Sequence, residues 1–320
     1  MPQLFNNNSH SFNTNNSFNT TYINPTVPDE RLNILTWLSQ LDPKLRHQDI
    51  CNRRVENIGE WVLQTEEFRS WHAGSGEGEP ENSFLFCYGD PGVGKTYIRY
   101  NNTNEPLRME EKRQVLTSRD VSSVIIDNLC GHVTGQNATV ACFYFDFAAQ
   151  NEQSPTAMLG CLVKQLVFGL NEIPEEILKA YEERKNAIGG QGPQISNILK
   201  MLQTTSSRRR AFICIDALDE CATEDRAKLL DSLGQLLQQS PGTRIFVTGR
   251  PHILPEIGRH LAGGVRSLSI NPKRGDIVTY LHSRLNADPT PDARDNSLEA
   301  DILEKIPSDI SEMYVMATAF

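Results

Sequence analysis

The sequence predicts an α/β protein built on a three-layer domain with a five-stranded parallel sheet. After residue 82, short apolar runs rich in Ile, Val, Phe and Cys alternate with amphipathic helical patterns. The runs are continuously apolar rather than alternating, which is typical of strands that helices cover on both faces. We expect strands at Phe84–Tyr88, Thr139–Phe147, Ala211–Asp216, Arg244–Thr248 and Val265–Ile270.

Helices should fill the intervals between these strands. The clearest begins near Ser154, which can cap the helix while Pro155 suits its first turn, and ends near Leu170. Towards the C-terminus only helical patterns remain, at Asp276–Leu285, at Ser297–Ile306 and from Ile310 onward. We therefore expect an α/β domain over residues 74–271 and a helical domain over residues 272–320.

The N-terminal part of the chain has a different composition. Its first 28 residues contain no Lys, Arg, Asp or Glu and are rich in Asn, Ser and Thr. Such a tract buries too little apolar surface to offset its ordering entropy, so residues 1–30 should form a disordered tail. A prion-like segment that stacks through Asn ladders is the alternative. Residues 31–73 should form a helical linker, with one helix before Pro43 and a second from Val55 to Trp71.

Composition excludes several classes of protein. The 320 residues include 31 basic and 40 acidic side chains, a net charge of −9 that argues against general nucleic-acid binding. No apolar stretch approaches the roughly 18 residues of a spanning helix, and no signal-peptide pattern opens the chain. The seven cysteines form no C-x-x-C pair, and most sit in apolar runs, so we expect buried, reduced thiols in a cytoplasmic protein. The seven histidines show no metal-ligand spacing.

A phosphate-binding motif follows the first expected strand. The motif G-x-x-x-x-G-K-[ST] is matched by Gly89, Asp90, Pro91, Gly92, Val93, Gly94, Lys95 and Thr96. Its glycines let backbone N–H groups surround phosphates. Lys95 would supply a charge for the β- and γ-phosphates, and Thr96 a hydroxyl for Mg²⁺. This segment therefore predicts a nucleotide site.

Carboxylates at the end of a second strand complete the expected site. The run from Phe212 to Ile215 ends in Asp216, which is the placement a Walker B acid needs to hold Mg²⁺. Asp219 and Glu220 follow closely, and either could orient an attacking water as catalytic base.

A third strand end should face the same ligand. The strand Arg244–Thr248 leads into Gly249 and Arg250. Ligands of open α/β sheets bind beyond the carboxyl ends of the strands. Thr248 and Arg250 should therefore point at the γ-phosphate, where a guanidinium can distinguish triphosphate from diphosphate.

The segment after the phosphate-binding motif breaks an expected pattern. A long helix normally follows such a loop directly, with its N-terminus facing the phosphates. Here residues 97–119 intervene, and helical apolar spacing resumes only at Val121. We expect residues 97–119 to be an insertion, such as a retained intron, with a tolerated surface insertion as the alternative.

The motifs GDPGVGKT, FICIDALDE and VTGRP, with RRVENIGEW upstream, resemble the NACHT family of STAND P-loop NTPases. The resemblance spans Leu32 to Phe320 and is strongest to fungal NLR-like proteins of the vegetative-incompatibility and nephrocystin-like types. It implies a switch that is closed with ADP and assembles when ATP replaces it, in innate immunity or heterokaryon incompatibility. It also implies that the strand carrying Thr248 lies between the strands that lead to Gly89 and Asp216. The family's winged-helix domain is absent before Phe320, so we expect a truncated member.

Together these observations predict a signal-transduction switch that binds ATP or ADP with Mg²⁺, GTP not being excluded. Hydrolysis should be slow or absent. Self-assembly would use the α/β domain, and an unknown effector would act through the N-terminal region; no nucleic acid or membrane is expected as a partner. The alternatives are a small-molecule P-loop kinase and an inert fragment.

Overall fold

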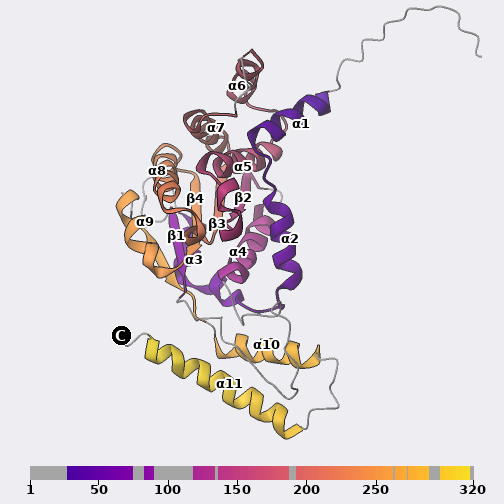
Figure 1. Ribbon diagram of the computed structural model, residues 1–320, viewed down its shortest axis with the longest axis vertical. Helices are drawn as coiled ribbons and strands as arrows, with labels where there is room; N and C mark the ends of the chain where they lie inside the picture. The colour runs from indigo at the N-terminus through magenta and orange to yellow at the C-terminus, as the bar shows by residue number, and fades with distance from the viewer. Residues whose placement is uncertain are drawn as a thin grey trace, which may run out of the picture.

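The apolar runs form a five-stranded parallel sheet. The computed structural model describes residues 27–74, 83–89, 118–133, 136–186, 192–261, 264–271, 273–287 and 296–317. The strands are β1 (Phe84–Tyr88), β2 (Ala138–Tyr144), β3 (Arg210–Asp216), β4 (Thr243–Gly249) and β5 (Arg266–Ser269). Every pairing is parallel, and the order is β2-β3-β4-β1-β5 (Figure 1). This arrangement confirms the predicted fold class and the place of β4 between β1 and β3.

Two helical layers cover the sheet. One face packs against α1 (Val27–Leu38), α5 (Pro155–Phe168), α6 (Glu175–Asn186), α7 (Ile195–Ser207), α8 (Thr223–Gln239) and α9 (Leu254–His260). The other face packs against α2 (Pro43–Arg53), the 3₁₀ turn η1 (Glu60–Gln64), α3 (Glu66–Ala73) and α4 (Ser118–Val133), and α10 (Arg274–Asn286) adds side chains to the same apolar cluster from beyond the end of the sheet. The described residues also form the 3₁₀ turns η3 (Phe147–Glu152), η4 (Leu218–Glu220) and η5 (Pro251–Ile253), and the helix α11 (Asn296–Ala317).

Local sequence explains most boundaries of these elements. Ser154 caps α5, as predicted, because its side chain accepts a hydrogen bond from the amide of Ala157 at 3.3 Å. The strand β2 is shorter than predicted: it ends at Tyr144, and Phe147 instead begins η3. Cys87, one of the cysteines expected in apolar runs, is fully buried within β1.

The prediction of one helix from Val55 to Trp71 is wrong. Helix α2 ends at Arg53, and the backbone then turns through Asn57 (φ 64°) and Gly59 (φ 80°). A right-handed helix cannot contain a positive φ, so the chain restarts as η1 and α3. The apolar side chains still reach the core, because η1 buries Val62 and α3 buries Phe68 and Trp71.

The N-terminal helices belong to the packing of the sheet. Trp71 on α3 is fully buried, and its indole N–H donates to the carbonyl of Ile245 at 3.1 Å. Its ring packs against Phe212 and Phe246 on two neighbouring strands. Residues 27–30, expected in the tail, form the first turn of α1, and residues 1–26 lie outside the described residues.

Two separate helices predicted at Ser297–Ile306 and from Ile310 onward are one continuous helix, so this prediction is wrong. Helix α11 contains Pro307 in its interior. A single proline removes one backbone donor, and the other hydrogen bonds of a 22-residue helix remain available to carry it past that position. Figure 1 shows α10 and α11 lying beyond the end of the sheet.

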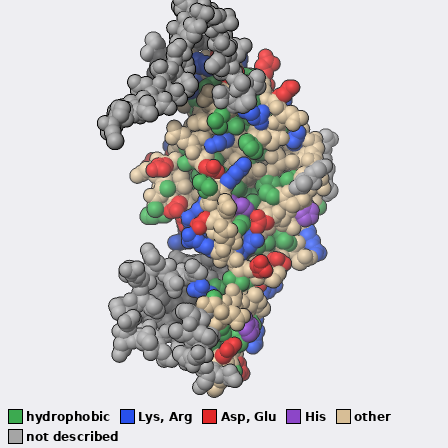
Figure 2. Space-filling model, turned by 90° about the vertical axis from the view of Figure 1, so that its right-hand side faces the viewer, with side chains coloured by type: hydrophobic (Ala, Val, Ile, Leu, Met, Phe, Trp, Pro, Cys, Tyr) green, Lys and Arg blue, Asp and Glu red, His purple; other side chains and the backbone are tan. Residues whose placement is uncertain are grey.

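The described helices include none that is long and apolar enough to cross a membrane. On the face drawn in Figure 2, basic and acidic side chains are interspersed, and neither sign forms a continuous patch.

Gly160 should be essential to the contact between α1 and α5. A Cβ added at this position would lie 2.2 Å from the carbonyl oxygen of Leu38, which is backbone and cannot rotate away. We expect Gly160→Ala to lower the free energy of unfolding by roughly 1–3 kcal/mol, as overpacking usually does. Urea denaturation measures this change. The control is Gly131→Ala on α4, where a Cβ meets nothing within 4 Å and alanine should be neutral or stabilising. Equal stabilities for the two variants would contradict the packing argument.

Candidate functional site

The predicted Walker B acid, Asp216, joins three elements at the carboxyl edge of the sheet. It is the last residue of β3, and its side chain is fully buried. Its Oδ1 accepts hydrogen bonds from the hydroxyl of Ser122 on α4 at 2.5 Å and from that of Thr248 on β4 at 2.6 Å. Thr248 in turn accepts a hydrogen bond from the amide of Ala217 at 3.0 Å. The carboxylate therefore fixes α4, β3 and β4 relative to one another.

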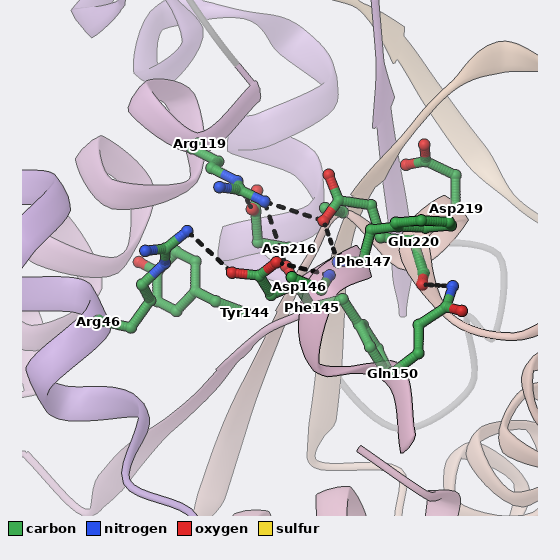
Figure 3. Close-up of polar contacts among 12 residues, drawn as sticks. Arg46, Arg119, Tyr144, Phe145, Asp146, Phe147, Gln150, Asp216, Asp219 and Glu220 are labelled. Carbon is green, nitrogen blue, oxygen red and sulfur yellow. Dashed lines mark hydrogen bonds and ion pairs between the residues drawn. The ribbon is translucent and has the colours of Figure 1, made fainter. Parts of the chain in front are cut away.

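The second oxygen of Asp216 has a different environment from the first. Among the described residues, Oδ2 is buried without a hydrogen-bond donor. The guanidinium of Arg119 faces it, with Nε 3.5 Å away. The same guanidinium donates through Nη2 to Glu220 at 2.9 Å and to the carbonyl of Phe145 at 3.3 Å. Figure 3 shows Arg119 directed between the two carboxylates.

Burial raises the pKa values of both carboxylates. Burial raises the pKa of Asp216 above its ordinary value, and the hydrogen bonds from Ser122 and Thr248 oppose this only in part. Burial also raises the pKa of Glu220, although Arg119 and the amide of Phe147 oppose the shift. Asp216 Oδ2, which has no donor among the described residues, lies near the Glu220 carboxylate and the hydroxyls of Ser122 and Thr248. These are hard oxygen ligands of the kind that Mg²⁺ prefers.

Asp219 and Arg250 form a second pair at the same edge. Arg250 Nε lies 3.2 Å from Asp219 Oδ2, and the backbone amide of Arg250 donates to Oδ1 at 3.2 Å. The side chain of Asp219 is 9% exposed and that of Arg250 is 49% exposed. The two residues thus come together, with the arginine on the solvent side and the acid beneath it.

The structure brings together the described part of the predicted site. Gly89 follows β1 directly, and Tyr88 pairs with Gly249, so this strand ends beside β4. Asp216, Asp219, Glu220, Thr248 and Arg250 lie at the same edge. The other residues of the phosphate-binding motif lie outside the described residues: Asp90, Pro91, Gly92, Val93, Gly94, Lys95 and Thr96. So do residues 97–117 of the predicted insertion.

Two residues of the site are not predicted by the sequence. Ser122 lies within the apolar pattern of α4, where a serine on a buried face is a signal that its hydroxyl has a partner. Arg119 falls at the end of the predicted insertion, but it lies in the first turn of α4 and contacts Asp216. No pattern in the sequence indicates this contact, because the two residues are far apart in the chain.

The sequence profile of the family described as nephrocystin 3, N-terminal, matches residues 57–115 and 121–250, more than half of the chain. The chain belongs to this family. The match includes the phosphate-binding motif and the strands that carry Asp216 and Thr248. The family match and the sheet order agree: this member of the nephrocystin 3 N-terminal family is a P-loop NTPase in sequence and fold. The matched residues include most of the predicted insertion, which stays a prediction.

Solved structures give more distant similarities. A Walker-type ATPase of Pyrococcus abyssi is 12% identical with a TM-score of 0.42, the alignment covering 77% of this chain and 65% of that one. The ORC1 protein of Aeropyrum pernix, solved in complex with DNA, is 14% identical with a TM-score of 0.39 and coverages of 72% and 51%. Cdc6p of Pyrobaculum aerophilum is 12% identical with a TM-score of 0.40 and coverages of 73% and 51%.

In each case this chain spans less than two thirds of the matched protein, and the similarity is too low to support an argument about function. No curated protein sequence matches the chain.

Replacing Asp216 by Asn should stabilise the protein at neutral pH. The pKa of Asp216 in the folded protein is raised above its ordinary value of 3.8. As the pH rises, Asp216 therefore loses its proton at a lower pH in the unfolded chain than in the folded protein. The charged carboxylate then lowers the free energy of unfolding at every pH above the ordinary pKa. Asp216→Asn removes this cost. We expect a higher urea midpoint for the variant at pH 7 and a gap that shrinks as the pH falls towards 4.

The control for this prediction is Asp301→Asn, which changes an exposed carboxylate paired with Lys305 and should shift the midpoint little at any pH. A neutral-pH midpoint for Asp216→Asn below that of the wild type would show that hydrogen bonds to the charged form outweigh burial.

Proposed function

We propose that the chain is a nucleotide-dependent switch of the NACHT and STAND type, which binds ATP or ADP together with Mg²⁺ and hydrolyses it slowly or not at all. The observation that carries this proposal is the Asp216 carboxylate, buried at the sheet edge where β1 leads into the phosphate-binding motif, with one oxygen lacking a hydrogen-bond donor among the described residues. Membership of the nephrocystin 3 N-terminal family supports it.

The roles of the side chains follow from their positions. Lys95 would neutralise the β- and γ-phosphates, and Thr96 and Asp216 would hold the cation. A bound divalent cation neutralises phosphate charge in such sites. Thr248 orients Asp216 through its hydroxyl. Arg250, exposed beyond β4, is suited to contact the γ-phosphate.

Slow hydrolysis is favoured by the state of the two catalytic candidates. Asp219 pairs with Arg250 and Glu220 pairs with Arg119. A general base must reach the proton that it takes, so a carboxylate held in an ion pair is poorly placed for the task. Glu220, whose side chain is 26% exposed, is the more accessible of the two. The arrangement therefore supports a binding switch better than a rapid enzyme.

The resemblance to NACHT proteins extends the proposal to partners. Self-assembly would use the α/β domain once ATP is bound, and an effector would contact the N-terminal region, in a cytoplasmic pathway of immunity or incompatibility. An inert protein that does not bind nucleotide is the second candidate, because the Arg119 guanidinium already lies against the Walker B acid.

Nucleotide binding by three forms of the chain tests the proposal. Mg-ATP and ADP are titrated into the wild type, Lys95→Ala and a variant lacking residues 97–119, by calorimetry. We expect the wild type to bind and Lys95→Ala to lose measurable affinity, because the phosphates lose their cationic partner. Lys228→Ala, which changes a lysine paired with Asp225 on α8, is the matched control and should bind normally.

If only the deletion variant binds nucleotide, the result favours the second candidate, the inert protein. If Lys95→Ala binds nucleotide as tightly as the wild type does, the proposal is overturned. Turnover measured with and without small acceptor molecules separates the switch from a kinase, because only a kinase accelerates when its acceptor is added.

Arg119→Ala should strengthen Mg²⁺-dependent nucleotide binding. The guanidinium competes with a cation for Asp216 and Glu220, and removing it leaves both carboxylates to the divalent ion. We expect a gain of roughly 5–30-fold in affinity, equivalent to about 1–2 kcal/mol. Titrations at fixed nucleotide and varied Mg²⁺ measure it. Arg46→Ala is the control, since Arg46 pairs with Asp146 rather than with these acids. Unchanged Mg²⁺ dependence in Arg119→Ala would contradict the competition.

A further inference from the structure

A histidine, a cysteine and an aspartate meet between α2 and α4. His47 and Cys51 lie one turn apart on α2, and Asp127 faces them from α4. His47 Nε2 is 3.5 Å from Cys51 Sγ and 3.0 Å from Asp127 Oδ1, and Cys51 Sγ is 3.8 Å from Asp127 Oδ1. Three different ligand types therefore present one donor atom each to the same small space. This cluster is separate from the carboxylates at the sheet edge.

The spacing of the three donor atoms matches a tetrahedral zinc site. With bonds of about 2.3 Å to sulfur, 2.05 Å to nitrogen and 2.0 Å to oxygen, tetrahedral angles place the nitrogen about 3.6 Å from the sulfur, the nitrogen about 3.3 Å from the oxygen and the sulfur about 3.5 Å from the oxygen. The observed separations of 3.5, 3.0 and 3.8 Å differ from these by 0.3 Å or less. Ordinary side-chain adjustment covers such differences.

Neighbouring groups orient the ligands in the way metal sites require. The Tyr144 hydroxyl lies 2.6 Å from His47 Nδ1, so Nδ1 can carry the proton and leave Nε2 to bind a metal. Arg54 donates to Asp127 Oδ2 at 2.9 Å, which leaves Oδ1 for a metal. A second hydrogen bond, from Arg54 to the Ser123 hydroxyl at 2.7 Å, fixes that arginine.

We propose that His47, Cys51 and Asp127 form a Zn²⁺ site that joins α2 to α4. Zinc is favoured over calcium or magnesium because sulfur and imidazole donors suit it and hard cations prefer oxygen. A thiolate and a carboxylate together neutralise the charge of the ion. The side chain of Asp127 is 43% exposed, so water can reach the fourth position. This proposal does not depend on nucleotide binding.

Binding through the thiol would release a proton. Zinc takes a cysteine ligand as the thiolate, so Cys51 would lose its proton on metal binding, as cysteines do at other thiolate sites. The spacing of the histidines does not indicate this site, because only one of the ligands is a histidine and Asp127 comes from another helix.

A matched pair elsewhere in the chain provides the control. His260 and Asp231 form the same type of ion pair, 2.6 Å between Nδ1 and Oδ1, with the histidine on α9 and the aspartate on α8. The groups that could hold a metal among the described residues do not include this pair. His260→Gln therefore removes a histidine and a carboxylate contact without touching the cluster.

The test uses the full chain, stripped with a chelator and titrated with Zn²⁺ or Co²⁺ alone. We expect one equivalent of Zn²⁺ to bind, and Co²⁺ to give the charge-transfer absorption of a thiolate ligand. Cys51→Ser and His47→Gln should each lose more than roughly tenfold in Zn²⁺ affinity, and Cys51→Ser should lose the absorption band. His260→Gln should bind as the wild type does. Zn²⁺ should raise the melting temperature of the wild type and not that of Cys51→Ser.

Circular dichroism checks that each variant folds, and Asp127→Asn replaces any that does not. The proposal is overturned if the wild type retains no Zn²⁺ against a weak chelator, or if Cys51→Ser binds the metal as the wild type does. If the wild type binds Zn²⁺ normally but does not bind nucleotide, the zinc proposal is supported and the proposed nucleotide switch is rejected.

Discussion

The structure depends on how it accommodates one buried carboxylate. Asp216 has no exposed side-chain surface, and an isolated charge there would be prohibitively costly. Hydroxyls from Ser122 and Thr248 satisfy one oxygen, and each comes from a different element. The carboxylate therefore fixes α4 and β4 against β3, and Arg119 faces its second oxygen. In the proposed switch the same side chain would also hold Mg²⁺, so one residue would serve both packing and nucleotide binding.

Helix α4 contacts Asp216 and begins at the end of the predicted insertion. Ser122 and Arg119 lie in its first two turns, and both contact Asp216. These two contacts hold the N-terminal part of α4 against Asp216. Arg119 is the cation that the chain itself places between the buried Asp216 and the partly exposed Glu220.

The sequence was sufficient for β1 to β4 because each contains a continuous apolar run, which is typical of a strand covered on both faces. The edge strand β5 has the sequence RSLS and contains no such run. The sequence was sufficient for the position of Asp216, because the residue that ends a buried parallel strand must lie at the carboxyl edge of the sheet. It failed where the outcome depended on backbone conformation, as at Asn57 and Gly59, which end a helical pattern whose apolar spacing continues. It also failed for Arg119, because an ion pair between distant segments leaves no trace in local composition.

The same helix links the sheet edge to the N-terminal segment. Ser122 of α4 contacts Asp216. Asp127, further along the same helix, contacts His47 on α2 and Arg54 at its end. Helix α2 and helix α3 pack on the same side of the sheet, where Trp71 is buried. The helices α2 and α3 therefore pack on the same side of the sheet as α4, the helix whose Arg119 faces the carboxylates of the site. Ser122 and Asp127 lie on one helix, so the contact with Asp216 and the contact with α2 belong to a single closely packed body rather than to two parts joined by a flexible linker.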